Sequence, residues 1–308
     1  MKLLATLSAF LFSGIVAASP LHNIVVFGDS LSDNGNLYEF MKHQLPQSPP
    51  YFEGRFSNGP VWVEHLAETY FPTSSSIHLL NYAFGGAGVS EEGEVDDVLF
   101  TLRREVESYL VSHQNQASDD TLYIVWIGAN NYLAMPEEVE QTLTDVNLGI
   151  THSLQRLVDH GAKHFLILNL PDLGRTPAAI EFGSTQTMSY FANQHNDSLK
   201  KTIANFQMAN PQVEWIYFDL NKMFGHVLEN PQEYGFSNIT GTCSNAEINE
   251  LTKKSVLQMV ASVTPLKAKD ACDGFIFFDL VHPTALAHRI IADKVRIMLD
   301  ETGVEFSE

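Results

Sequence analysis

Short apolar runs alternate with longer amphipathic stretches along most of this chain. Each run is nearly continuous and rich in β-branched or aromatic residues, as is typical of strands buried on both faces of a parallel sheet. The runs that fit this pattern are residues 22–27, 77–83, 122–127, 164–170 and 213–218.

The stretches between these runs carry helical periodicity. One helix is expected after Asn58 and Gly59, with Pro60 in its first turn, and a last one from Pro283 to about Leu299. Alternating strands and helices predict βαβ units, and hence a three-layer α/β/α sandwich around a mostly parallel sheet of about five strands. The remaining helices are expected at about residues 95–113, 137–160 and 185–209.

Polar and glycine-rich clusters lie at the ends of these elements. Residues 28–30 (Gly-Asp-Ser) follow the first predicted strand, 85–86 (Gly-Gly) the second and 128–130 (Gly-Ala-Asn) the third, while Asp279 and His282 precede the last helix. Ligands of parallel sheets bind outside the carboxyl ends of the strands. We therefore expect these clusters to converge on one rim of the sheet.

The clusters contain the groups that ester hydrolysis by a serine nucleophile requires. Ser30 is the candidate nucleophile, His282 its base, and Asp279 the acid that orients the imidazole; these three form a candidate catalytic triad. The candidate oxyanion donors are the backbone N–H groups of Ser30 and Gly86 and the side-chain amide of Asn130. This mechanism requires no metal and no cofactor.

Several neighbouring residues have a competing interpretation. Asp29 is expected to stabilise the turn before Ser30 rather than to act as an acid, because Asx side chains bond to local backbone. Arg55, Ser57 and Asn58 fit a turn and helix start as well as they fit substrate contact.

Composition and charge narrow the classes of protein. The chain has 308 residues, of which 44% are hydrophobic and 18% charged, so it can bury a substantial core. Its formal net charge of -19 excludes a general nucleic-acid binder and argues against electrostatic adsorption to anionic membranes.

The first residues are typical of a secretory signal. Lys2 precedes an apolar run from Leu3 to Val16, too short to span a bilayer, and small residues lead to a cleavage site near Ala18. We expect residues 1–18 to be removed, leaving a single domain without stable membrane insertion. That domain, residues 19–308, would be secreted, either extracellular or periplasmic in transit.

Export changes what the two cysteines signify. Cys243 and Cys272 are expected to pair as a disulfide in an oxidising compartment, because neither metal-ligand spacing nor an activating partner for a thiol is present nearby. They lie in a stretch from Asn221 to Phe275 without a clear strand. This stretch is expected to be a disulfide-closed excursion, with its loop at 243–272, near the site.

Four sequence blocks resemble those of the GDSL, or SGNH, hydrolases, in that family's order and over essentially the whole mature chain. They read FGDSLSDNGN, NYAFGGA, IGANN and DLVHPT. The resemblance implies the flavodoxin-like SGNH-hydrolase fold and an ester hydrolase. It also implies signature roles for Ser30, Gly86, Asn130 and His282, with Asp279 completing the triad. Asn131 departs from the family pattern, which more usually has Asp there.

Residues 51–67 are similar to the secreted bacterial branch that includes lysophospholipases A and glycerophospholipid:cholesterol acyltransferases, whose members also carry a cysteine pair before the catalytic Asp and His. The resemblance implies a lysophospholipid or phospholipid substrate, with acyl transfer to an alcohol or sterol as a second outcome. It also implies an activating protease that cuts the 243–272 loop, at Lys253-Lys254 or Lys267. A carbohydrate or aryl acetylesterase, and a catalytically idle surface-binding protein, are the alternatives.

Overall fold

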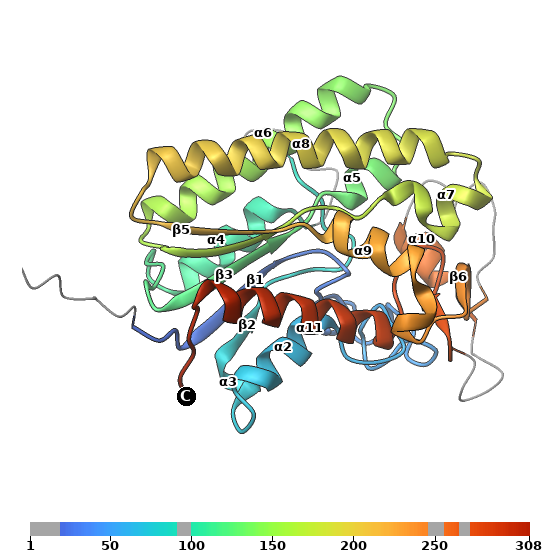
Figure 1. The fold of residues 1–308 in the computed structure, drawn as a ribbon, viewed down its shortest axis with the longest axis horizontal. Coiled ribbons are helices and arrows are strands. Elements are labelled where there is room, and N and C mark those ends of the chain that lie inside the picture. Colours follow the sequence, from blue (N-terminus) through green and yellow to red (C-terminus); the bar gives the residue numbers. More distant parts are fainter. Residues whose placement is uncertain (1–18, 91–99, 246–255, 265–271) are drawn as a thin grey trace, which may run out of the picture.

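The computed structural model describes residues 19–90, 100–245, 256–264 and 272–308 (Figure 1). At its centre lies a parallel sheet with the strand order β2-β1-β3-β4-β5. This is the flavodoxin-like order, in which the direction of winding changes between β1 and β3. The strands are β1 (Asn23–Gly28), β2 (Leu79–Asn81), β3 (Thr121–Trp126), β4 (His164–Leu168) and β5 (Glu214–Phe218).

Strand β1 shows why the apolar runs become central strands. It pairs residue for residue with β3, from Asn23 opposite Thr121 to Gly28 opposite Trp126, and with β2 on its other side. Its residues Ile24 to Phe27 are at most 1% exposed, because helices cover both faces of the sheet. Continuous burial removes the need for alternating polar positions, as predicted.

Helices on the two faces complete a three-layer sandwich. Helices α6 and α8 lie over one face in Figure 1, and α2 and α11 lie against the other. The fold class predicted from the sequence is therefore confirmed. The main helices are α2 (Trp62–Tyr70), α4 (Leu102–Ser112), α6 (Val139–Asp159), α8 (Thr185–Ala209) and α11 (Ala285–Thr302).

The excursion near the site contains more regular structure than predicted. A small second sheet pairs β6 (Asn238–Thr242) with β7 (Phe275–Phe277), although the sequence showed no clear strand before Phe275. β6 escaped prediction because its composition, NITGT, lacks a continuous apolar run and it is only half-buried. The other short elements are α1 (Asn36–Phe40), α3 (Ser75–His78), α5 (Ala129–Leu133), α7 (Pro177–Glu181), α9 (Leu220–Glu229) and α10 (Val256–Ala261), with 3-10 turns at Leu173–Arg175 and Pro231–Tyr234.

Two predicted helix starts were placed too early. Helix α2 begins at Trp62 rather than near Pro60, and α11 begins at Ala285 rather than at Pro283. The backbone just before each helix, at Val61 and Thr284, is extended rather than helical. The helix expected from residue 95 is described from Leu102 onward.

The expected signal peptide, residues 1–18, lies outside the described residues, as do Lys253, Lys254 and Lys267. Within the described parts of the chain, no helix combines the length and apolarity needed to cross a membrane.

Candidate active site

Ser30 lies on the tight turn that follows β1, at the carboxyl rim of the sheet. The carbonyl of Asp29 accepts hydrogen bonds from the backbone N–H groups of Ser32 and Asp33, both at 3.0 Å. The Asp29 side chain accepts one from the Leu31 N–H, also at 3.0 Å. Asp29 therefore stabilises this turn, as predicted, while the Ser30 side chain is free to project into a cavity.

The three candidate triad residues are brought into hydrogen-bond contact. His282 Nε2 lies 2.8 Å from Ser30 Oγ, and His282 Nδ1 lies 2.8 Å from Asp279 Oδ2. A carboxylate can only accept, so Nδ1 carries the proton and Nε2 is left to accept the proton of Ser30. Serine and histidine, 252 residues apart in sequence, thus have the geometry of a nucleophile and its base.

Asp279 is completely buried and saturated with donors. Its Oδ1 accepts from the backbone N–H groups of Val281, at 2.9 Å, and of His282, at 2.7 Å. Burial by itself would raise the pKa of Asp279, but the charge and hydrogen bond of His282 and the hydrogen bond from Tyr51 hold that pKa below its ordinary value. The carboxylate therefore stays ionised inside the protein and can stabilise an imidazolium.

Asn130 stands on the rim beside Ser30, at the start of α5. Its Nδ2 donates to the carbonyl of Ala87 at 2.8 Å, which leaves the second amide hydrogen for another acceptor. Behind it, Tyr132 and His195 join α5 to α8 through a 3.0 Å contact between the hydroxyl and Nδ1. Burial lowers the pKa of His195 to about 4, so this imidazole is a neutral partner.

Gly86 lies next to the carbonyl that Asn130 binds, but it is not among the residues that line the cavity. Its φ of 79° is left-handed, which favours glycine. A Cβ added there would lie 3.0 Å from Leu257 of α10. The structure thus brings Ser30, Asn130 and His282 to one cavity and places α10 directly over Gly86.

Asn131, the departure from the family pattern, has a structural explanation. Its Oδ1 accepts from the Val89 N–H and its Nδ2 donates to the Val89 carbonyl, both at 2.8 Å. An amide can do both, whereas a carboxylate can only accept. Asn131 therefore holds the backbone at Val89, three residues after Gly86, against α5.

Two further carboxyl groups lie behind Ser30, and the sequence analysis assigned neither. Glu105 accepts the Gly28 N–H at 2.8 Å, and Asp33 accepts the Gly85 N–H at 2.7 Å, so each holds one glycine segment of the rim. Burial raises the pKa of Asp29 and Asp33 to about 6 and that of Glu105 well above its ordinary value. No local spacing rule connects Glu105, on α4, with Ser30.

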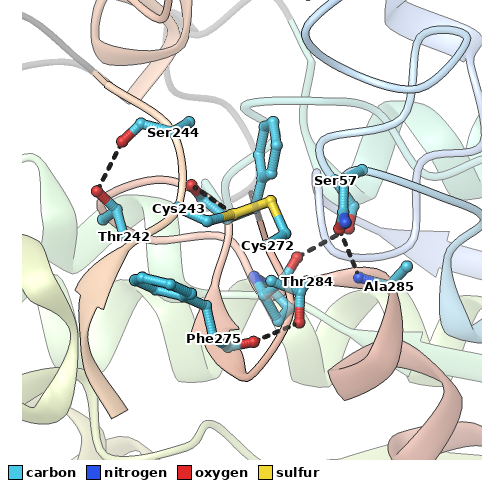
Figure 2. The surroundings of a disulfide bond; sticks show 11 residues. Ser57, Thr242, Cys243, Ser244, Cys272, Phe275, Thr284 and Ala285 are labelled. Carbon is cyan, nitrogen blue, oxygen red and sulfur yellow. Dashed lines mark hydrogen bonds between the residues drawn. A yellow bond between two sulfur atoms is a disulfide. The ribbon is translucent and has the colours of Figure 1, made fainter. Parts of the chain in front are cut away.

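A disulfide joins Cys243 to Cys272, as expected. Figure 2 shows it beside Phe275 and the Thr284–Ala285 backbone that starts α11. The backbone N–H groups of Cys243 and Ser244 donate to the carbonyls of residues 277 and 278, immediately before Asp279. The disulfide thus secures the chain that leads to Asp279 and His282.

Ser57 and Asn58 contact the protein rather than the cavity. Ser57 Oγ donates to the Pro283 carbonyl at 2.9 Å, and Asn58 Oδ1 accepts from the Ala285 N–H at 2.8 Å. Arg55 pairs with Glu64 at 2.6 Å. Of the two interpretations left open by the sequence, the structural one fits these contacts.

The cavity extends from Ser30 over the carboxyl ends of the central strands. Its wall is mostly apolar. Asp29, Asp172 and Thr176 add polar groups to the lining beside Ser30, Asn130 and His282. The apolar lining side chains come from the strand ends, the loop after β4, and helices α5, α9, α10 and α11: Leu31, Trp126, Ala129, Leu133, Pro171, Leu173, Leu220, Phe224, Val256, Phe277, Val281, Pro283 and Ile291.

The family model described as GDSL-like lipase/acylhydrolase matches residues 24–295. The chain belongs to this family. The predicted family resemblance is therefore confirmed, and with it the assignment to carboxylic-ester hydrolases.

Two relatives align with most of the sequence of this chain. A phosphatidylcholine-sterol acyltransferase of Aeromonas hydrophila is 32% identical over 92% of this chain and 91% of its own length. A thermolabile hemolysin of Vibrio parahaemolyticus is 28% identical over 89% of this chain, which spans 63% of that protein.

Among solved structures, a phospholipase A1 from Streptomyces albidoflavus matches with a TM-score of 0.47 and 13% identity, over 90% of this chain and 99% of its own. A carbohydrate acetylesterase from Sinorhizobium meliloti matches with a TM-score of 0.48 and 14% identity, over 90% and 99%.

Proposed function

We propose that this acylhydrolase acts on lipid esters, with lysophospholipids and phospholipids as substrates, in the manner of a phospholipase A. The observation that carries the proposal is the apolar cavity that opens at Ser30. Its lining is mostly aliphatic and aromatic, so the apolar tail of a long acyl chain would be removed from water there, whereas an acetyl group has little apolar surface to bury.

The energetics of transfer favour the same substrates. Each methylene buried in an apolar wall contributes about 0.8 kcal/mol, so each pair of added methylenes improves binding by roughly tenfold while the cavity still has room. Trp126, Leu220 and Phe224 contribute large apolar surfaces to that wall. This favours a lipid esterase over a carbohydrate or aryl acetylesterase.

In the proposed first step, Ser30 Oγ attacks the carbonyl carbon of the ester while His282 Nε2 takes its proton. Asp279, hydrogen-bonded to Nδ1, stabilises the imidazolium that forms. The negative charge on the tetrahedral carbonyl oxygen is received by the N–H groups of Ser30 and Gly86 and by the Asn130 amide. His282 then returns the proton to the departing alcohol, which leaves an acyl-enzyme on Ser30.

In the second step, His282 takes a proton from water as the water attacks the acyl-enzyme carbonyl. His282 then returns that proton to Ser30 Oγ as the fatty acid leaves. Any hydroxyl that reaches the ester before water does accepts the acyl group instead. The relationship to a phosphatidylcholine-sterol acyltransferase, at 32% identity, supports transfer to a sterol as a second activity.

A substrate panel tests the proposal. The protein would be incubated with lysophosphatidylcholine, diacyl phosphatidylcholine, p-nitrophenyl esters from acetyl to palmitoyl, and acetylated sugars, each with and without cholesterol, and products identified by mass spectrometry. We expect kcat/KM to rise with acyl length. We also expect Ser30→Ala to lose at least about 10⁴-fold in kcat and to escape fluorophosphonate labelling. Activity confined to acetyl esters contradicts the lipid substrate, and an unchanged Ser30→Ala variant contradicts the mechanism.

We further propose that the chain is exported after removal of residues 1–18 and is activated by a protease that cuts the 243–272 loop. Two contacts of the described part of that loop support the proposal that the loop controls access to the site. Leu257 lies against Gly86, and Val256 lines the cavity. Cutting the purified protein with trypsin, mapping the cuts, and assaying lysophosphatidylcholine before and after tests the idea. A loop-cut protein with an unchanged rate contradicts it.

A further inference from the structure

Residues 51–58, which we name the clamp segment, wrap around the chain that carries Asp279 and His282. Besides the bonds of Ser57 and Asn58 to residues 283 and 285, the Phe56 ring packs on the His282 imidazole with ring centres 5.2 Å apart. The clamp segment closes on itself through a bond from the Phe52 N–H to the Ser57 carbonyl, at 2.9 Å. Neither of the proposed reaction steps assigns this segment a role.

The first residue of the clamp segment reaches the orienting carboxylate itself. The Tyr51 hydroxyl donates to Asp279 Oδ2 at 2.5 Å, and Tyr51 is 2% exposed. Oδ2 is also the oxygen nearer to His282 Nδ1, at 2.8 Å against 3.0 Å for Oδ1. The phenol and the imidazole therefore share one carboxylate oxygen.

The surroundings keep this hydroxyl in place and protonated. The Tyr51 ring packs edge-on against Phe278, with centres 5.0 Å apart, and lies in an apolar cluster with Phe56 and Val260 of α10. Burial, followed by the negative charge of Asp279, raises the pKa of Tyr51 well above its ordinary value. The phenol is thus a fixed donor, and because Asp279 is 0% exposed, water has no access to replace it.

We propose that Tyr51 is a positioning residue of the reaction: its hydroxyl fixes the Asp279 carboxylate, and through it the tautomer and angle of His282. Without Tyr51, Oδ1 keeps its two backbone donors, but Oδ2 is bound only by His282, the residue that Asp279 has to orient. With Tyr51 bound to Oδ2, both oxygens are held, and the carboxylate cannot rotate away when the imidazolium forms. This inference rests on the proposed roles of Ser30, Asp279 and His282.

Tyr51→Phe tests it, since the variant removes one oxygen and keeps the ring that fills the apolar cluster. With p-nitrophenyl butyrate as substrate, we expect kcat to fall about tenfold with KM unchanged, because misorientation affects the transition state and not substrate binding. Tyr123→Phe is the matched control. Tyr123 is a fully buried tyrosine whose hydroxyl bonds to Ser118 and Tyr109, away from the site, and its variant is expected to keep the wild-type kcat.

A spectroscopic readout separates positioning from a general loss of structure. The imidazole proton between His282 and Asp279 should give a low-field resonance in the proton NMR spectrum, and we expect it to move in Tyr51→Phe and to stay in Tyr123→Phe. In the wild-type protein, the Tyr51 hydroxyl proton should show a nuclear Overhauser contact to that proton, since both point to Oδ2. This second measurement needs no variant and decides the matter if Tyr51→Phe does not fold.

A folded Tyr51→Phe with kcat within about twofold of the wild type overturns the proposal. The proposal is also overturned if Tyr51→Phe is less active only because a smaller fraction of the protein is active, while the low-field resonance does not move. Where the variant does not fold, the absence of the Overhauser contact in the wild-type protein overturns it. Failure of the proposed function has a different signature. If Ser30→Ala keeps its activity, the mechanism itself is wrong whatever Tyr51→Phe does.

Discussion

The two halves of the candidate site are built in different ways. Ser30 and Asn130 lie within a few residues of the ends of β1 and β3, neighbouring strands of the central sheet. Asp279 and His282 stand on an irregular segment between β7 and α11, outside that sheet. The Ser30 half inherits its geometry from the register of two buried strands. The His282 half is positioned by contacts from residues far away in sequence.

These distant contacts are few and specific. The Tyr51 hydroxyl, the Ser57 hydroxyl and the Asn58 amide bind the segment from one side. The strand pairing of β6 with β7 and the disulfide bind it from the other. The half-site built on strands should lose activity when a reacting group is removed. The half-site that is held by these distant contacts, which we call tethers, should also lose activity when one of the contacts is removed. The following experiments test that difference.

The largest effect is expected in the sheet-built half. Asn130→Ala removes one oxyanion donor and should lower kcat by about 10²–10³, equivalent to about 2.7–4 kcal/mol, with little change in KM. Steady-state kinetics with p-nitrophenyl butyrate measures this.

Asn131→Ala, which changes the neighbouring residue, is the control for Asn130→Ala. It loses two bonds to Val89 and should lower the free energy of unfolding by about 2 kcal/mol, with a smaller effect on kcat than Asn130→Ala. Equal kcat losses in the two variants contradict the assigned donor.

The next effect concerns the tethered half. Replacing Cys243 and Cys272 together by serine opens a loop with a sequence separation of 29 and should lower the free energy of unfolding by about 3.5 kcal/mol. Urea unfolding of the variant and of the wild type, with and without reductant, measures the loss. The reduced wild type should match the double variant. If reduction leaves the stability unchanged, the disulfide does not hold this half.

The smallest effect probes the carboxyl groups behind Ser30. The folded pKa of Asp29 is raised by burial from 3.8 to about 6, so its contribution to stability is complete below about pH 4 and is lost as the pH rises through 6. Asp29→Asn lacks this loss, and its stability relative to the wild type should increase by about 3 kcal/mol at most between pH 4 and pH 7.

Urea unfolding at several pH values measures this difference. Asp119→Asn is a control of opposite sign, because the hydrogen bond from Lys163 lowers the pKa of Asp119, and the variant should lose stability relative to the wild type as the pH rises. A stability difference between Asp29→Asn and the wild type that stays constant with pH contradicts the buried, charge-sensitive role of this carboxyl.

The sheet-built half could be predicted from the sequence because its signals are local. A continuous apolar run ending in Gly-Asp-Ser predicts a buried strand and the turn after it, and the alternation with helices predicts a parallel sheet. The same reasoning placed Asn130 beside Ser30. Where it failed, the signal was weak. β6 is half-buried and contains glycine, and the two early helix starts depended on prolines that lie before the helices rather than in them.

The tethers that hold the half-site of Asp279 and His282 could not be predicted from local sequence. Tyr51 and Asp279 are 228 residues apart, and nothing in either local sequence states that the phenol will meet the carboxylate. Glu105 likewise reaches Gly28 across 77 residues. From the amino-acid sequence by itself, the central strands, the turn after β1 and the candidate residues Ser30, Asn130, Asp279 and His282 could be predicted, because each depends on a local pattern or on a family block. Only the tertiary structure decided which buried donors complete Asp279, since burial and hydrogen-bond satisfaction are properties of the packed chain.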